Sequence, residues 1–186
     1  MNQDNRPLFT SSLTLAAVVT AVSCSRLFVR YTLKEIGLAH LTDDAELVVS
    51  ELMTNAVEAT GVMAAHPRWT ELHDLALVRL SVVRLRSGLV VEVWDRDPTP
   101  PVVKEAAWDD ENGRGLFIVT ELCQRWNYFF PPGGGKVIWG ELEIPPYEYT
   151  ANGLPKRPHV PGLAKPAEVM QDPEMLKRVI DGLNGL

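Results

Sequence analysis

The chain of 186 residues is long enough for one domain with a sizeable hydrophobic core, or for one domain with an appendage. Its composition, 46% hydrophobic and 23% charged, is that of an ordinary globular protein. The net charge of -6 argues against a general nucleic-acid binder, which would normally present a basic surface, so no direct nucleic-acid partner is expected. A protein partner or a small metal-bound ligand fits this charge balance better.

The N-terminal part of the chain predicts a strand over residues 8–15 and a helix over residues 16–37. The apolar run LTLAAVVTAVSC in this helix lacks the preceding basic segment of a secretion signal, and no run is long enough to span a membrane. Cys24 and Cys123 have neither metal-ligand spacing nor a disulfide framework, and both are expected to be buried and reduced. These observations predict a cytoplasmic protein with no membrane association.

A second helix is predicted through ELVVSELMTNAVEAT, residues 46–60, with Thr42 or Asp43 as its N-cap. Glu51 and Asn55 lie four positions apart and therefore project from one face of this helix. One interpretation is a solvated stripe on an ordinary amphipathic helix. The other is a pair of groups directed at one small target.

The middle of the chain predicts a loop and then a hairpin. Residues 61–75 look like a loop insertion, and its His66 and His73 lack a third ligand, so no metal site is expected there. LALVRLSVVRL and LVVEVWD alternate apolar and polar residues, which indicates two strands around a turn at Ser87-Gly88. Asp95 ends the second strand, where it either starts a turn or accepts a hydrogen bond from a ligand.

The segment ENGRGLFIV, residues 111–119, places two glycines before a helix. Free N–H groups at such a helix start bind phosphate, although a flexible helix start is an equally ordinary reason for the glycines. The helix is expected to run through GLFIVTELCQRW, with a final hairpin formed by WNYFF and KVIWGELEI. The order strand, helix, helix, hairpin, helix, hairpin predicts an α+β fold, a two-layer sandwich with a mixed, mostly antiparallel sheet covered by helices.

Composition divides the chain near Ile144. Half of the fourteen prolines lie in residues 145–186, so we predict a folded domain over residues 1–144 and a proline-rich extension over residues 145–186. Asp172 and Pro173 would begin a short amphipathic helix in the extension that docks on its own domain or on a partner.

In this order, E-x-x-x-N on a helix, a strand-terminal Asp and G-x-G opening a helix resemble the nucleotide-binding boxes of the GHKL (Bergerat-fold) ATPases. The segments ELVVSELMTNAV, VEVWDRDPTPP and GRGLFIVTELCQRW look like the small single-domain branch of anti-sigma factor serine kinases and related regulatory ATP-binding proteins. The similarity covers about residues 13–144. It implies the Bergerat ATP-binding fold, ATP and Mg²⁺ as cofactors, and a protein partner such as an anti-sigma antagonist or a sigma factor. A homodimer is also possible, because relatives often are dimers.

The resemblance implies a role for each matched residue. Glu51 would be the general base that activates the attacking hydroxyl, Asn55 would ligate the Mg²⁺, and Asp95 would bind the adenine amino group. Residues 99–114 would form a lid over the nucleotide. The phosphates would be contacted by the residues around the start of the third helix, which are Gly113, Arg114, Gly115 and Leu116.

The sequence departs from the family pattern in three places. DRDPTPP lacks the glycines of the usual D-x-G-x-G, and a Thr common in the final box is replaced around Gly135-Lys136-Val137. Glu58 stands where relatives usually carry a basic or neutral residue, and we expect it to face water. These changes put the shape of the adenine pocket in doubt more than they affect the phosphate end.

The leading hypothesis is an ATP-dependent protein serine/threonine kinase of the anti-sigma type, which phosphorylates or sequesters a protein partner in transcriptional or developmental signalling. The alternative is a catalytically inactive, nucleotide-gated protein-binding module, which would have no need of Glu51 as a base. A DNA-directed or chaperone ATPase of the same superfamily is disfavoured by the acidic charge.

Overall fold

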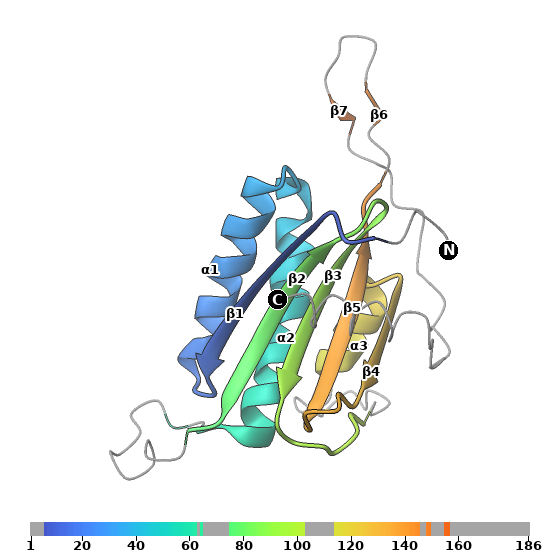
Figure 1. Ribbon diagram of the computed structural model, residues 1–186. Helices are drawn as coiled ribbons and strands as arrows, with labels where there is room; N and C mark the ends of the chain where they lie inside the picture. The colour runs from blue at the N-terminus through green and yellow to red at the C-terminus, as the bar shows by residue number, and fades with distance from the viewer. Residues whose placement is uncertain are drawn as a thin grey trace.

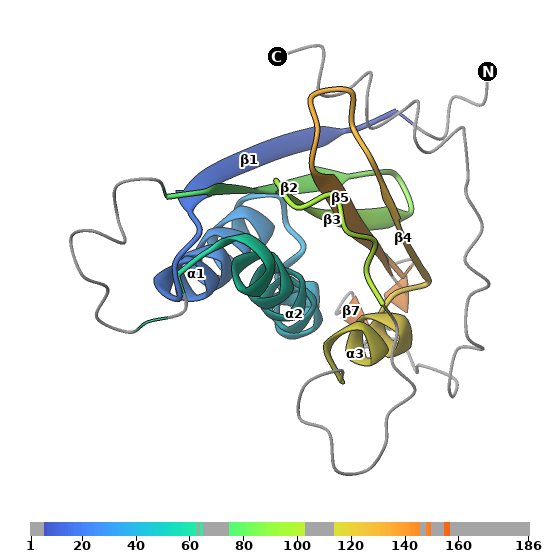
Figure 2. The ribbon, with the colours of Figure 1, turned by 90° about the horizontal axis from the view of Figure 1, so that it is seen from below.

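The computed structural model describes residues 6–62, 64, 75–102, 114–145, 148–149 and 155–156. In this part of the chain, five strands form an antiparallel sheet and the helices α1, α2 and α3 cover one of its faces (Figures 1 and 2). The elements of this domain are β1 (Phe9–Ala16), α1 (Thr20–Glu35), the short 3-10 helix η2 (Ala39–Leu41), α2 (Thr42–Thr60), β2 (Leu77–Arg84), β3 (Gly88–Asp95), α3 (Arg114–Leu122), β4 (Arg125–Phe129) and β5 (Lys136–Glu143).

The predicted two-layer α+β fold and its order of elements are confirmed. The strand order is β1-β2-β3-β5-β4, and each neighbouring pair is antiparallel. Parallel pairing within the described residues is limited to an isolated bridge between Val18 and Val62. β4 lies at the edge of the sheet, whereas β5, the last of the five strands along the chain, lies between β3 and β4.

Three predicted helix boundaries are wrong. The first helix begins at Thr20 instead of residue 16, because Ala16 still belongs to β1. Leu41, not Thr42 or Asp43, is the N-cap of α2, and it makes no side-chain cap hydrogen bond, because η2 runs directly into this helix. The third helix ends at Leu122 instead of reaching Trp126. The chain leaves the helix there because the N–H of Gln124 already donates to the carbonyl of Glu141 on β5 (2.8 Å).

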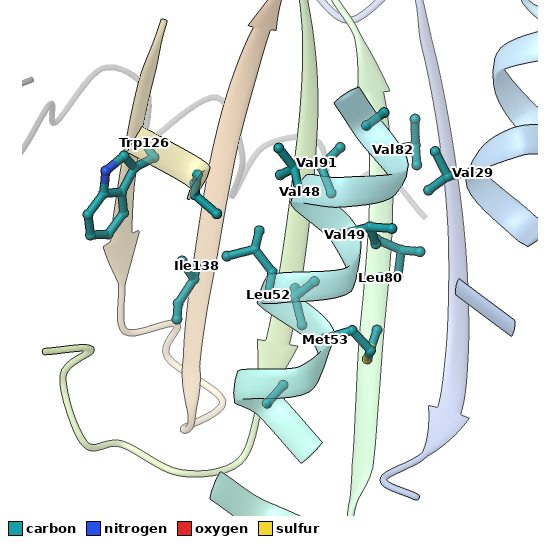
Figure 3. Close-up of a cluster of buried hydrophobic side chains, with 14 of the residues drawn as sticks. Val29, Val48, Val49, Leu52, Met53, Leu80, Val82, Val91, Trp126 and Ile138 are labelled. Atoms are coloured by element: carbon teal, nitrogen blue, oxygen red, sulfur yellow. The ribbon is translucent and has the colours of Figure 1, made fainter. Parts of the chain in front are cut away.

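The main hydrophobic core lies between the helices and the sheet (Figure 3). Val48, Val49, Leu52 and Met53 of α2 are almost completely buried and pack towards the aliphatic side chains of the strands. Burying one such side chain contributes roughly 1.5–3 kcal/mol. The aliphatic strand side chains labelled there are Leu80, Val82, Val91 and Ile138. This packing fixes α2, the helix that carries Glu51 and Asn55, against the centre of the sheet.

The outer face of the sheet, which points away from the helices, is also buried at its centre. It carries a second cluster formed by Leu85, Val90, Phe129, Val137 and Trp139, with Val83 and Trp94 packed against it. The alternation predicted for β3 therefore holds, but both of its faces are largely covered. Glu92 is among the buried residues of this outer face, and the alternation alone did not predict its burial.

The two cysteines differ in their surroundings. Cys24 is exposed, contrary to the prediction, because it occupies the outer side of α1, whereas Cys123 is buried as expected. Burial raises the pKa of the Cys123 thiol to about 12.

In the extension the structure describes β6 (Glu148–Tyr149) and β7 (Pro155–Lys156), which pair as a small antiparallel hairpin. The helix predicted from Asp172 lies outside the described residues, as do His66 and His73. In the part of the chain that is described, no helix is long and apolar enough to cross a membrane.

Candidate functional site

Helix α2 presents Glu51 and Asn55 to the first turn of α3. Both side chains are half-buried, one helical turn apart on the same face. A Cβ atom placed on Gly115 would lie only 2.7 Å from Oε2 of Glu51 and 3.7 Å from Nδ2 of Asn55. The glycine therefore allows the backbone that opens α3 to approach both polar side chains closely. Three of the predicted site residues meet at this point.

The environment of Glu51 favours a proton-accepting role. Burial raises the pKa of this carboxyl, and the negative charge of Glu58 raises it further. A carboxylate with a raised pKa is a better base near neutral pH than an ordinary surface carboxylate. Glu58 itself is exposed to solvent, as predicted.

Asp95 ends β3 with its side chain only 1% exposed. Its Oδ1 atom accepts hydrogen bonds from Nζ of Lys136 (2.9 Å) and from the backbone N–H of Asp97 (2.9 Å). Its Oδ2 atom is buried and has no hydrogen-bond partner in the described structure. One oxygen of Asp95 thus organises the turn, as one of the two interpretations predicted, and the other has no donor among the described residues. Leaving a buried acceptor unpaired costs about 1–3 kcal/mol, which a ligand with an N–H donor would recover.

Lys136, in the segment where the sequence departs from the Thr of the family pattern, forms a buried ion pair with Asp95. Its side chain is 6% exposed, and Nζ also donates to the carbonyl of Asp97 (3.0 Å). Burial raises the pKa of Asp95, and the hydrogen bond and charge of Lys136 oppose that rise. The preceding Gly135 has φ +75° and lies directly against the carbonyl of Asp95, so a side chain at this position would clash with the strand end.

A pocket of about 190 Å³ connects these elements. Its walls include Asn55 from α2, Gly115 and Leu116 from α3, and Lys136 and Ile138 from β5. The turn after β3, residues 97–102, forms another wall with Asp97, Thr99 and the prolines that replace the usual glycines. The structure therefore places Asn55 of α2, the turn after β3 and the start of α3 around one pocket. Asp95 lies behind this wall, joined to it by its hydrogen bonds from Lys136 and Asp97.

Two of the predicted phosphate contacts are not tested by the structure. Gly113 and residues 103–112 of the predicted lid lie outside the described residues. Arg114 begins α3, and its side chain is outside the described part. Gly115 and Leu116 both line the pocket.

The residues present suit a nucleotide better than a metal site made of protein ligands. Among the described residues, no three His, Cys, Asp or Glu side chains gather in a way that could hold a metal ion. Asn55 contributes one amide oxygen at the pocket wall, which is compatible with a Mg²⁺ ion carried mainly by phosphates and water. The unpaired Oδ2 of Asp95 is a buried acceptor for which the described residues supply no donor.

The fold and this arrangement define the GHKL class of ATPase domains, in which a helix-covered antiparallel sheet carries the pocket. The comparison with family models agrees: residues 15–139 match the histidine kinase-like ATPase domain. The match covers more than half of the chain, and the protein belongs to this family. No curated protein matches the chain significantly.

The sequence did not predict the ion pair between Lys136 and Asp95. The departure around Gly135-Lys136-Val137 was evident from the sequence, but the contact that Lys136 makes was not. In the sheet, Lys136 lies directly opposite Asp95 on the neighbouring strand. That register joins two strands separated by α3 and β4, so no local motif could reveal it.

Proposed function

We propose that the protein binds ATP with Mg²⁺ and transfers the γ-phosphoryl group to a serine or threonine of a protein partner. The observation that carries this proposal is the close approach of Gly115, at the start of α3, to Glu51 and Asn55. This approach supports the proposal that Glu51 as a base, Asn55 as a metal ligand and the N–H groups at the start of α3 act on one phosphate. The partner would be an antagonist of an anti-sigma factor, or a sigma factor that is sequestered.

The residues of the pocket would divide the chemistry among them. ATP with Mg²⁺ supplies the transferable phosphoryl group and neutralises part of its charge. Oδ2 of Asp95 would accept a hydrogen bond from the amino group of the base, and Asn55 would orient the metal-bound phosphates. Glu51 would take the proton of the partner's hydroxyl as that oxygen bonds to phosphorus and ADP leaves. Positioning and charge, rather than covalent chemistry by the protein, would account for the rate.

Binding is tested by calorimetry with Mg²⁺-ATP on wild type and on Asp95→Asn. We expect the variant to bind at least tenfold more weakly, about 1.4 kcal/mol, because an amide cannot replace the carboxylate as an acceptor without rearrangement. Asp43→Asn, an exposed position in the first turn of α2, is the matched control and should bind as wild type does. Thermal unfolding of each variant shows whether it remains folded. Absence of binding by the folded wild type contradicts the proposal.

Transfer is tested separately with γ-phosphate-labelled ATP and candidate partner proteins. Glu51→Gln should keep nucleotide binding and lose transfer by about a hundredfold or more, because it removes the base. Glu58→Gln changes an exposed carboxyl on the same helix and should leave transfer within a few-fold. Equal labelling by wild type and Glu51→Gln would favour the alternative, a nucleotide-gated binding module. The cytoplasmic location and the homodimer stay predictions from the sequence.

A further inference from the structure

The outer face of the sheet contains a buried carboxyl group that the nucleotide site does not use. Glu92 lies in the middle of β3, opposite Ser81 on β2 and Trp139 on β5. Glu92 is only 5% exposed, and its Oε1 atom has no hydrogen-bond partner in the described structure. The hydroxyl of the neighbouring Ser81 is engaged with Ser12 (3.0 Å). A buried carboxyl without a partner is costly, so its retention requires an explanation.

A pocket of about 240 Å³ opens over this carboxyl. Glu92 and Ser81 line it together with Trp94 and Val137, and the turn between β4 and β5 closes another side with Pro131, Gly133 and Gly134. The indole N–H of Trp94 donates to the carbonyl of Gly134 (3.0 Å), which fixes the turn beside the aromatic ring. The helices α1, α2 and α3 lie on the opposite side of the sheet (Figure 2). The site is therefore separate from the nucleotide pocket.

Arg79 is the cationic residue that lines this pocket. It pairs with Trp94 in the sheet register, which places it diagonally across from Glu92 on the same face. Arg79 is nevertheless exposed and forms no ion pair with Glu92 in the structure. Among the described residues, the carboxyl inside the pocket is thus left without a counter-ion, while an aromatic ring and an aliphatic side chain surround the space above it.

We propose that this outer-face pocket binds an organic cation of side-chain size, an alkylammonium or a guanidinium group. Glu92 supplies the counter-charge, the ring of Trp94 offers an aromatic surface to the cation, and Val137 contacts its alkyl part. A lysine or arginine side chain of a polypeptide and a free amine share this chemistry. The inference is independent of nucleotide binding, since it concerns the other face of the sheet.

The test is a titration of the full chain at pH 8 with n-butylammonium and n-butylguanidinium, followed by the NMR signal of the Trp94 indole N–H. Trp94→Phe assigns that signal. We expect saturable shifts with dissociation constants in the millimolar range, and at least tenfold weaker binding to Glu92→Gln. Glu143→Gln, an exposed acid at the end of β5, is the matched control and should bind as wild type does. Neutral n-pentanol, of similar shape, should bind at least tenfold more weakly than the cations.

Three results would overturn the proposal: no saturable shift with either cation, equal binding to Glu92→Gln, or equal binding of n-pentanol. If Glu92→Gln does not fold, Trp94→Phe provides a second test, with binding followed on backbone amides of β3 and expected to weaken several-fold. Lysine capped at both its backbone ends distinguishes the two sources of the cation. If capped lysine binds as tightly as n-butylammonium, the ligand of this pocket is a polypeptide side chain. If capped lysine binds much more weakly, the ligand is a free amine.

Discussion

Strand β3 carries two buried acids on its opposite faces, and their surroundings differ by one cation. Asp95, beside the helix-covered face, is paired with Lys136, whereas Glu92, on the outer face, has no cationic partner in the part of the chain that the structure describes. Burial raises the pKa of both carboxyls, but Lys136 opposes the rise at Asp95, while burial alone raises the pKa of Glu92 to about 7. The charge of Asp95 is thus balanced by a neighbouring lysine, whereas the charge of Glu92 depends on the pH.

The clusters around the two acids also differ in composition. The core under the helices is mainly aliphatic, with Val48, Leu52 and Leu80 as examples, whereas the outer-face cluster contains Trp94, Phe129 and Trp139. Aliphatic packing serves to hold α2 and its functional side chains in place. Aromatic side chains are common where a surface contacts a ligand or a partner. The two faces therefore differ in the kind of side chain that packs on them, aliphatic under the helices and largely aromatic on the outer face.

The largest expected effect comes from removing the cation on the nucleotide side. Lys136→Met leaves Asp95 as a buried carboxylate without a counter-charge, so we expect the free energy of unfolding at pH 7 to fall by about 3–5 kcal/mol. Urea unfolding followed by circular dichroism measures this loss. The variant would make the two acids of β3 alike, since each would then be buried and unpaired.

The double variant Asp95→Asn, Lys136→Met controls for the loss of lysine packing. Removing both charges should restore a large part of the stability, because no unpaired ion remains. Lys34→Met, at an exposed position in the last turn of α1, should change stability by less than about 0.5 kcal/mol. If Lys136→Met is as stable as wild type, the ion pair does not have the role that the structure gives it.

A somewhat smaller effect on the free energy of unfolding is expected from substituting Glu92 on the outer face, and its size depends on the pH. The folded state holds the proton of Glu92 more tightly than the unfolded chain does, where the usual value is 4.5. The stability associated with the neutral acid is therefore fully present below pH 4.5 and is lost as the pH rises through about 7. Glu92→Gln removes this dependence. Relative to wild type, it should gain up to about 3 kcal/mol between pH 4 and pH 8, as measured by urea unfolding at each pH.

Glu143→Gln serves as the comparison for that experiment, because its exposed carboxyl lies on the adjacent strand. It should follow the wild-type pH dependence within about 0.5 kcal/mol. A pH dependence of Glu92→Gln that is identical to that of wild type would mean that Glu92 is solvated or paired in solution.

The sequence predicted those features that depend on neighbours along the chain. The four-residue spacing of Glu51 and Asn55 fixed their common helix face, and the end of an alternating segment located Asp95 at a strand end. Element order followed from hydrophobic periodicity in the same way. Each of these inferences needs only a helix or a strand, not the arrangement of several elements.

What the sequence did not predict depends on tertiary contacts. The pairing of Lys136 with Asp95 requires the register of β5 on β3, and the burial of Glu92 requires that both faces of β3 be covered. The exposed Cys24 shows the same limit, because an apolar run does not say which of its residues face the sheet. The departure at Lys136 was visible in the sequence, but its physical consequence appeared only when the two strands were placed side by side.

The smallest expected effect comes from alanine substitutions at two glycines, one beside each pocket. Gly115→Ala adds one methyl group 2.7 Å from Oε2 of Glu51, which must displace this flexible carboxylate while the fold itself persists. We expect unfolding stability within about 1 kcal/mol of wild type and a loss of phosphoryl transfer of about tenfold, because a base displaced by a fraction of an ångström is poorly aligned. Gly133→Ala, beside the outer-face pocket, meets no atom within 4 Å and should leave transfer unchanged. Equal activity of the two variants would show that the approach of α3 to Glu51 is unimportant for the reaction. A loss confined to Gly115→Ala would assign the chemistry to the helix-covered face of the sheet.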